Sequence, residues 1–386
     1  MEIKFNSDMI LDKHFFNLKK LSYKYSVKDV ADMLAFADEI LFEKVKLKDF
    51  NGNLIAFMPS KISISNKVYR KLLLPSTSTY STKSMEDEIH STFSIENINS
   101  SRDSVRKILR GLAPTNNQEE YIYAMKRALD FISDKENKIT EENLFKLYNI
   151  AIVDFLDDED KLLDENFYRH DKVYIVGDEI AHQGISHDLL PTYMKEFIEF
   201  INADDNINQL QKACIIHFYF AYLHPYFDGN GRTARLVHLW YLIQSGFSST
   251  LFTSFSKYIS LSKNDYYGAF TLVEENYKIS KKIDLTPFLH YFSVNIYDKI
   301  EVENGDIKTF EIYEQNLKEG NVTEKETKLW SFVIANYGSD SFSTKQLEKD
   351  FSDVAYATIR KFVLKFKDLG LLKSQKFGNR LKYHIV

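Results

Sequence analysis

Two helical patterns on either side of a short polar loop constrain the fold of this chain most. Residues 213–223 are almost all apolar, as expected of a buried helix. Residues 233–245 carry apolar side chains at helical spacing and stop at Gly246, a residue that favours a helix C-terminus. Between them, residues 224–235 read His-Pro-Tyr-Phe-Asp-Gly-Asn-Gly-Arg-Thr-Ala-Arg. The pattern predicts two core helices joined by a loop rich in functional groups.

The end of this loop has the features of an anion-binding site. Gly229, Asn230 and Gly231 lead into the second helix, whose first N–H groups have no partner within the helix. Glycines let a phosphate approach the backbone closely, and the asparagine offers an amide donor. Arg232 and Arg235 are three residues apart, so both can reach one ligand, and guanidinium groups suit phosphate oxygens.

Two further residues of the loop add chemistry to this predicted phosphate site. Asp228 offers a hard oxygen ligand, and Mg²⁺ on a phosphate needs only one or two carboxylates from the protein. His224 can accept a proton from an attacking hydroxyl near neutral pH. A base, a metal ligand and a diphosphate cradle together predict nucleotidyl transfer. The competing interpretation is a helix–loop–helix whose charges are only solvated.

The loop resembles the Fic family motif, His-x-Phe-x-(Asp/Glu)-Gly-Asn-Gly-Arg-x-x-Arg, with Tyr226 in place of the usual Phe. The resemblance implies a helical Fic domain that moves AMP from ATP to a Ser, Thr or Tyr hydroxyl of a target protein. Carried over by position, its residues have the following roles. His224 is the base, Asp228 the Mg²⁺ ligand, Gly229, Asn230 and the Gly231 backbone the anion hole, Arg232 the ligand of the α- and β-phosphates, and Arg235 the ligand of the γ-phosphate.

A second resemblance lies upstream, where residues 92–97 read Thr-Phe-Ser-Ile-Glu-Asn. They resemble the family's inhibitory motif, (Ser/Thr)-x-x-x-Glu-(Gly/Asn). Ser84 is followed by three acidic residues, which predicts a helix start and an inhibitory helix over residues 84–97. In the resembling proteins the glutamate, here Glu96, pairs with the second motif arginine and keeps ATP in an unproductive pose. Without the family context, Glu96 would be an ordinary surface charge.

The segment before the motif contains a strand signal. Residues 168–177 are rich in β-branched and aromatic side chains and end at the turn pair Gly177-Asp178. By position they resemble the hairpin flap of the family, which adds the target as an extra strand, here around Val173–Val176. A plain hairpin is the alternative. His182 and His187 are interpreted as polar loop residues without a metal.

Residues 256–259 and the pair Tyr266-Tyr267 resemble the family segment that lines the base pocket. Aromatic faces suit a purine, so Tyr267 is the predicted contact. Core packing of an amphipathic helix is the alternative and fits at least one of these tyrosines.

The C-terminal residues predict a different unit. Helices over residues 323–336 and 355–369, a short one starting near Ser343, and a hairpin around Gly378-Asn379 suggest a winged helix over residues 320–386. The third helix and the hairpin are rich in Lys and Arg, which permits phosphate contacts. DNA binding, protein docking and homodimerisation all remain open, because a fold alone does not define a partner.

Length and composition set the outer limits. The 386 residues suffice for two or three domains, and we assign residues 1–80 to an N-terminal α/β extension of unclear role and residues 81–300 to the catalytic domain. Within the extension, residues 27–46 have helical spacing and residues 54–65 alternate like a strand. The net charge of −5 gives no overall attraction to nucleic acid. Cys214 is expected to be a small core residue, and the absence of an 18-residue apolar span predicts a cytoplasmic protein without membrane contact.

The sequence therefore predicts a mainly α protein that acts as an autoinhibited protein adenylyltransferase with ATP and Mg²⁺. Two alternatives remain. The chain could be a DNA-binding regulator that uses its C-terminal unit, or an enzyme that removes AMP by using Glu96 to orient a water molecule.

Overall fold

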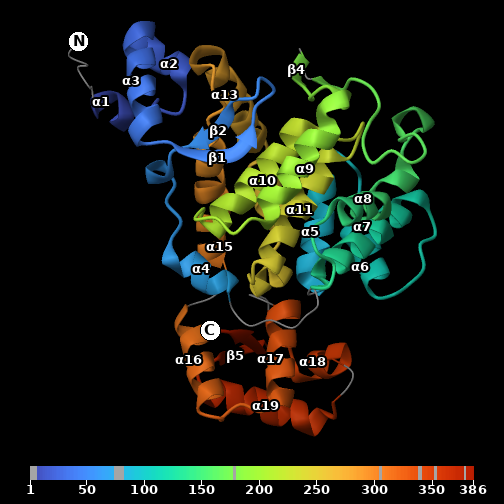
Figure 1. Ribbon diagram of the computed structural model, residues 1–386. Coiled ribbons are helices and arrows are strands. Elements are labelled where there is room, and N and C mark those ends of the chain that lie inside the picture. Colours follow the sequence, from blue (N-terminus) through green and yellow to red (C-terminus); the bar gives the residue numbers. More distant parts are fainter. Residues whose placement is uncertain are drawn as a thin grey trace.

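The computed structural model describes residues 7–73, 82–176, 180–303, 307–337, 341–351, 354–377 and 380–386. In these residues helices dominate, and the strands form small antiparallel hairpins, β1 with β2, β3 with β4 and β5 with β6 (Figure 1). The prediction of a mainly α fold is confirmed. Among these described residues, no helix is both long enough and apolar enough to cross a membrane.

The N-terminal segment contributes to two cores: its first helices form a small cluster around Leu21, Val30 and Ala37, and its strands and the helix after them pack into the large core of the central body. Its elements are α1 (Ser7–Leu11), α2 (Leu18–Lys24), α3 (Val27–Ile40), β1 (Glu43–Lys48), β2 (Leu54–Phe57) and α4 (Asn66–Leu72). The predicted helix over residues 27–46 is too long, because the chain turns after Leu41 and enters β1. The predicted strand over residues 54–65 is also too long. Pro59 opens a 3₁₀ turn directly after β2, and proline has no N–H for a strand ladder.

The central body is a set of helices packed on one large core. Its elements are α5 (Thr82–Ile95), α6 (Arg102–Leu109), α7 (Asn117–Ser133), α8 (Glu141–Ala151), α9 (Leu190–Asn202), α10 (Gln209–Leu223), α11 (Asn230–Gln244), α12 (Phe255–Leu261), α13 (Lys263–Ser280) and α14 (Thr286–Tyr291). The helices α10 and α11 lie against each other in the middle of this body (Figure 1) and are buried on almost every side. Cys214 of α10 is a buried core residue, as predicted. The loop between α10 and α11 is therefore held by two closely packed helices of the main core.

The hairpin near this loop is shorter than predicted. It comprises β3 (Tyr174–Val176) and β4 (Ile180–Gln183), while the predicted turn at 177–178 lies outside the described residues. The prediction of a strand from residue 168 is wrong. Tyr168 and Arg169 are buried, and the backbone N–H of Arg169 donates to the carbonyl of Pro225 rather than to a neighbouring strand.

The C-terminal elements lie together at one end of the molecule (Figure 1) and share a separate core around Trp330 and Phe366. They follow α15 (Asp298–Glu303) and are α16 (Ile307–Lys318), α17 (Glu324–Tyr337), α18 (Thr344–Phe351), α19 (Tyr356–Asp368), β5 (Leu372–Phe377) and β6 (Arg380–Ile385). The last three helices and the hairpin follow the predicted order, and the predicted turn at 378–379 lies outside the described residues. Helix α17 contacts α5 of the central body.

Candidate functional site

The loop between α10 and α11 is shaped by two residues with left-handed backbone. His224 caps α10 with a φ of 53°, and Gly229 precedes α11 with a φ of 77°. A Cβ at Gly229 would lie 2.7 Å from a side-chain carbon of Ile152, so the position has neither the backbone conformation nor the space for a side chain. Because α11 begins at Asn230, the amides of residues 230–232 belong to its first turn and are available to an anion.

Asn230 holds the loop closed through both polar atoms of its side chain. Its side-chain oxygen accepts from the N–H of Tyr226 at 3.0 Å, and its side-chain nitrogen donates to the carbonyl of Tyr226 at 2.7 Å. Tyr226 is fully buried and stacks on Tyr148 with ring centroids 3.5 Å apart. Its side chain therefore packs into the core, as expected for the position that is usually Phe. The Tyr226 hydroxyl has no hydrogen-bond partner in the described part of the chain.

His224 is arranged to accept a proton. Its Nδ1 lies 3.2 Å from the carbonyl of Ala221, and because a carbonyl can only accept, Nδ1 carries the hydrogen. The unprotonated Nε2 is then the acceptor. Burial lowers the pKa of His224 to about 4, so the imidazole is neutral at pH 7.

The two arginines of the motif are buried and incompletely bonded. Arg232 Nη2 donates to Asp228 at 2.8 Å, and Arg235 Nε donates to the hydroxyl of Thr92 at 2.7 Å. Arg235 Nη2 donates to Glu96 Oε1 at 2.5 Å. In the described part of the chain, Arg232 Nε and Arg235 Nη1 are buried without an acceptor. Buried donors without acceptors are costly, and an anion would satisfy them. These residues therefore fit a polyphosphate, and the carboxylate of Asp228, which is 57% exposed, is accessible to a cation.

Glu96 follows the end of α5 and lies against the start of α11. In addition to the contact with Arg235, its Oε1 would lie 2.7 Å from a Cβ at Gly231, so that glycine allows the close approach. Tyr267 also reaches this point, with its hydroxyl donating to the carbonyl of Ile95 at 3.4 Å. The neighbouring Tyr266 is buried and bonds His217 at 2.8 Å, so core packing is the correct interpretation for Tyr266.

The helix α5 is anchored by a second acid that the sequence did not single out. Glu88 is buried, and its Oε2 accepts from the hydroxyl of Ser254 at 2.9 Å and from the N–H of Ser256 at 3.0 Å. Burial raises the pKa of Glu88, while these hydrogen bonds oppose that rise. The contacts fix α5, and with it Glu96, to the start of α12.

Two more residues near the loop differ from their sequence-based interpretation. His182 lies in β4 and not in a loop, and its ring bonds the carbonyl of Tyr222 at 2.7 Å and the carboxylate of Glu274 at 2.5 Å. Arg169 falls in the predicted strand, but its side chain bonds the backbone of the loop at His224. A single arginine in an apparent strand gives no periodic signal that could have identified it. His187 lies in a 3₁₀ turn, 3.0 Å from Asp188.

Comparison with known proteins places this loop in a family. Residues 138–242 match the model of the Fic/DOC family. A probable protein adenylyltransferase of Aquifex aeolicus is 26% identical over 142 residues, which are 36% of this chain and 43% of that protein. Protein adenylyltransferase fic-1 of Caenorhabditis elegans is 24% identical over 147 residues, 38% of this chain and 26% of that protein. The chain thus spans less than half the length of these relatives.

Solved structures also match, at lower sequence identity. A Fic family protein from Desulfovibrio desulfuricans is 18% identical with a TM-score of 0.47, covering 79% of this chain and 86% of that one. Fic-1 from C. elegans is 20% identical with a TM-score of 0.42, covering 55% and 60%. The match to residues 138–242 contains the whole loop from His224 to Arg235, so this part of the chain is a Fic domain. Glu96 lies before the matched residues.

Proposed function

We propose that this protein is an adenylyltransferase that moves AMP from ATP to a hydroxyl group of a target protein. The observation that carries the proposal is that one loop contains both a neutral histidine and two buried arginines. His224 is neutral at pH 7, and each arginine has a side-chain N–H without an acceptor within the described structure. The names of the relatives, protein adenylyltransferases, support the same reaction.

In the proposed reaction, His224 Nε2 removes the proton of the target hydroxyl. The hydroxyl oxygen attacks the α-phosphorus of ATP, the bond from that phosphorus to the α–β bridging oxygen breaks, and pyrophosphate leaves. The proton on His224 is then released to solvent. Arg232 and the first amides of α11 stabilise the phosphate charge, and Asp228 would hold Mg²⁺, which neutralises further charge on the phosphates when bound.

The target would bind at the β3–β4 hairpin. Tyr174 and Ile175 of β3 are 44% and 37% exposed, and their backbone is already extended. An extended target segment can add to such an edge as a further strand, which brings its hydroxyl toward the loop through main-chain hydrogen bonds.

Glu96 would keep this activity low. Its carboxylate occupies Arg235 Nη2, the donor that we assign to the γ-phosphate. ATP must therefore displace a charge-assisted hydrogen bond to adopt the productive pose.

The test uses ATP labelled at either the α- or the γ-phosphate, with Mg²⁺ and cell lysate as the source of targets. Glu96→Gly should transfer the α-label to protein and leave the γ-label in solution, and adding His224→Ala should abolish the transfer. Transfer of the γ-label would replace the proposal with a kinase-type reaction. Removal of α-label from a modified target by the wild type, but not by Glu96→Gly, would instead make Glu96 part of an AMP-removing enzyme.

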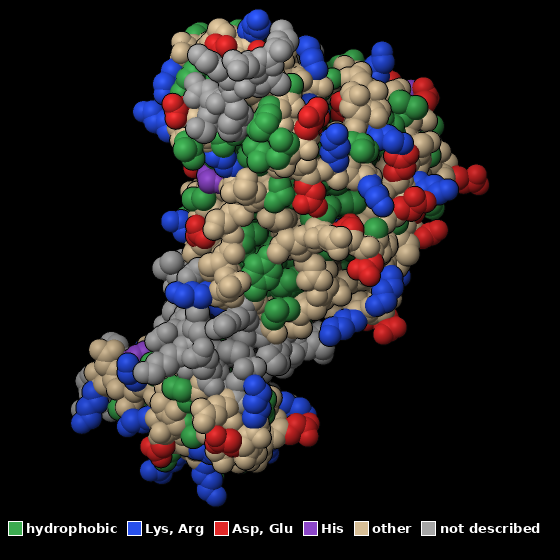
Figure 2. Space-filling model, turned by 60° about the vertical axis from the view of Figure 1, so that its left-hand side comes forward, with side chains coloured by type: hydrophobic (Ala, Val, Ile, Leu, Met, Phe, Trp, Pro, Cys, Tyr) green, Lys and Arg blue, Asp and Glu red, His purple; other side chains and the backbone are tan. Residues whose placement is uncertain are grey.

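A second candidate function belongs to the C-terminal unit, which we propose as a nucleic-acid interface. Residues 354–386 contain eight Lys or Arg and a single acidic residue, in a chain with a net charge of −5. Arg360, Lys361 and Lys367 of α19 and Lys373 of β5 are exposed. Lys and Arg side chains are more numerous than acidic ones on the visible face of this lower part of the molecule (Figure 2). Such segregated charge suits a phosphate backbone.

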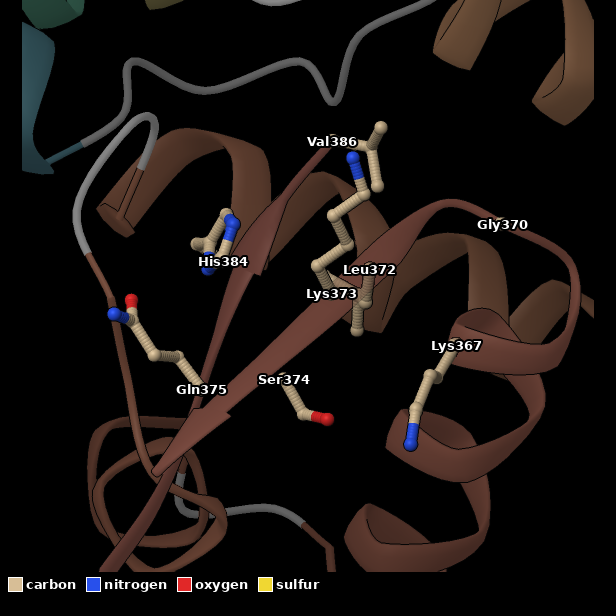
Figure 3. Close-up of a pocket in the computed structure, with 8 residues that line it drawn as sticks. All are labelled: Lys367, Gly370, Leu372, Lys373, Ser374, Gln375, His384 and Val386. Atoms are coloured by element: carbon tan, nitrogen blue, oxygen red, sulfur yellow. The ribbon is translucent and has the colours of Figure 1, made fainter. Parts of the chain in front are cut away.

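A cavity of about 530 Å³ lies between the end of α19 and the β5–β6 hairpin. Figure 3 shows that Lys367 and Lys373 border it together with the polar side chains of Ser374, Gln375 and His384. Figure 3 shows the ammonium groups of Lys367 and Lys373 pointing in different directions, so they suit two separate phosphates rather than a single one.

Fluorescence anisotropy with a labelled DNA duplex over a salt series tests this second candidate. Wild type should bind with an affinity that falls as salt rises. The double change Lys367→Glu/Lys373→Glu should weaken binding and reduce the salt slope by about 0.9 for each phosphate that the protein no longer neutralises. Lys345→Glu, on the exposed side of α18, is the matched control. Equal binding by the double variant and the control would exclude this surface.

A further inference from the structure

We infer that Arg169 is a positioning residue that fixes the backbone of His224 to both ends of the β3–β4 hairpin. The inference rests on the proposed function, in which His224 is the base and the hairpin receives the target. The side-chain hydrogen bonds of Arg169 all go to main-chain carbonyls, so it would act by holding the base and the receiving strand in a fixed relation.

The contacts of Arg169 connect three separate segments. Its Nε donates to the carbonyl of His224 at 2.8 Å, and its backbone N–H donates to the carbonyl of Pro225 at 3.0 Å. Nη1 donates to the carbonyl of Asp171 at 2.5 Å, before the hairpin, and Nη2 donates to the carbonyl of Ile185, after it. One side chain thus bonds the loop and both ends of the hairpin.

The arrangement is unusual for a residue that only stabilises the fold. Arg169 is 2% exposed, and its three side-chain hydrogen bonds all go to main-chain carbonyls rather than to a carboxylate. Burial lowers the pKa of Arg169 to about 10, so the group is still charged at pH 7. A buried cation without a paired anion is costly, whereas the planar guanidinium fork sets the directions of several bonds at once. The balance of these effects favours positioning.

His224 needs such a support because its backbone is left-handed, which is unfavourable for a residue with a side chain. The bond from Arg169 fixes its carbonyl, and the bond to Ala221 fixes its ring. There is little free space around these groups. A Cβ at Gly184 would lie 2.8 Å from Arg169 Nη2 and 3.1 Å from the Cβ of His224.

The kinetic test compares Arg169→Gln and Arg169→Lys, each made in the wild type and in Glu96→Gly. Both changes should lower kcat by about tenfold to a hundredfold, the range expected for a displaced base, and leave ATP binding by calorimetry unchanged. Lysine keeps the charge but not the planar fork, so it should not rescue activity. Gly184→Ala should lower kcat in the same way while retaining the arginine. Arg110→Gln, an exposed arginine of the same domain, is the control.

A second readout does not depend on transfer. Burial is the main cause of the low pKa of His224; Arg169 and His182 lower it further, while the hydrogen bond to Ala221 and the charge of Asp228 raise it. Loss of the charge alone should raise the pKa of His224 in Arg169→Gln, so Arg169→Lys, which keeps the charge, reports positioning. A displaced ring is less buried, so the pKa of His224, measured by NMR of its ring carbon in the full chain, should also rise in Arg169→Lys. If no variant transfers AMP but the titration moves in Arg169→Lys, the proposed function fails and the positioning role stands. Full activity of Arg169→Lys, or an unchanged His224 titration in Arg169→Lys, would overturn the inference.

Discussion

At the scale of single residues, Tyr226 stands where the Fic motif usually has Phe. Its hydroxyl is buried without a hydrogen-bond partner in the described structure. Its ring stacks on Tyr148, whose hydroxyl is likewise buried without a partner there. Burial raises the pKa of both phenols, so neither is a proton donor or acceptor of use near neutral pH. The site therefore depends on the ring of Tyr226 and not on its oxygen.

From this follows a prediction about the unbonded hydroxyl. Tyr226→Phe should raise the free energy of unfolding by up to about 1 kcal/mol, because a buried hydroxyl without a partner is removed and the stacked ring is kept. Urea unfolding measures the change, and transfer activity should be unaltered. Tyr148→Phe is the matched comparison. A loss of stability in both would show that a bound water satisfies the two hydroxyls.

Asp228 gives a prediction at the same scale. Asp228→Ala should abolish most of the activity, and the activity that remains should no longer respond to Mg²⁺, because the loop holds no other carboxylate. A Mg²⁺ titration of transfer measures this. Asp188→Ala removes a carboxylate that is 78% exposed, outside the loop, and should leave the titration unchanged. An unaltered titration in Asp228→Ala would exclude Asp228 as the ligand.

At the scale of elements, three glutamates hold α5 in place. Glu88 fixes its middle to α12, and Glu96 fixes its end to Arg235. Arg102 and Arg106 of α6 add ion pairs to Glu86 on the same helix. Arg235 also donates from its Nε to the hydroxyl of Thr92 on α5. Removing the carboxylate of Glu96 should therefore free Nη2 of Arg235 while α5 stays in place.

We therefore expect Glu96→Gly to raise AMP transfer by roughly tenfold to a hundredfold, the range that corresponds to a charge-assisted contact of about 1.5–3 kcal/mol. Its cost in stability should be about 1 kcal/mol or less. Arg235→Ala in the same background should cancel the gain, since both changes act on one contact. Glu120→Gly, on the exposed side of α7, is a control for the glycine itself. Equal transfer by wild type and Glu96→Gly would remove autoinhibition from the proposal.

There is a physical reason why some elements could be predicted from the sequence and others could not. The helices around the loop were predictable because α10 is an almost unbroken apolar run and α11 carries apolar residues at helical spacing, and α11 then places both arginines by its geometry. The segment from residue 168 was wrongly predicted as a strand. Its β-branched and aromatic residues also suit an irregular segment whose backbone donates a hydrogen bond to a distant loop. The contact between Arg235 and Glu96 could be predicted only from the resemblance to the Fic family, because the two residues are 139 positions apart in the sequence.

At the scale of the whole molecule, the junction of α10 and α11 contains two buried histidines. His217 and His238 are each 1% exposed, with ring centroids 5.6 Å apart. Burial holds the pKa of His217 well below its usual value and lowers that of His238 to about 3. Both rings are therefore neutral in the folded protein at pH 7 and sit in the core that supports the loop.

This pair should make the fold sensitive to acid. In the unfolded chain a histidine takes up a proton below about pH 6.5, whereas these two in the folded chain do not until far lower pH. The unfolded state thus binds more protons in that window, and stability should be level above pH 6.5 and fall as the pH is lowered toward 3. The slope should be about 1.4 kcal/mol per pH unit for each histidine. Urea unfolding at pH 7.5, 6.5, 5.5 and 4.5 measures it, and equal stability at pH 7.5 and 5.5 would contradict the prediction.

The distance in sequence between Glu96 and the motif also determines the order in which the two are synthesised. Arg235 follows Glu96 by 139 residues, so a ribosome that adds about 5–20 residues per second completes Glu96 some 7–30 seconds before Arg235. The partner of the arginine thus leaves the ribosome before the arginine is made. A newly made chain would close its nucleotide site with a segment already present, and at no stage of synthesis would it carry a complete motif without the glutamate that contacts it.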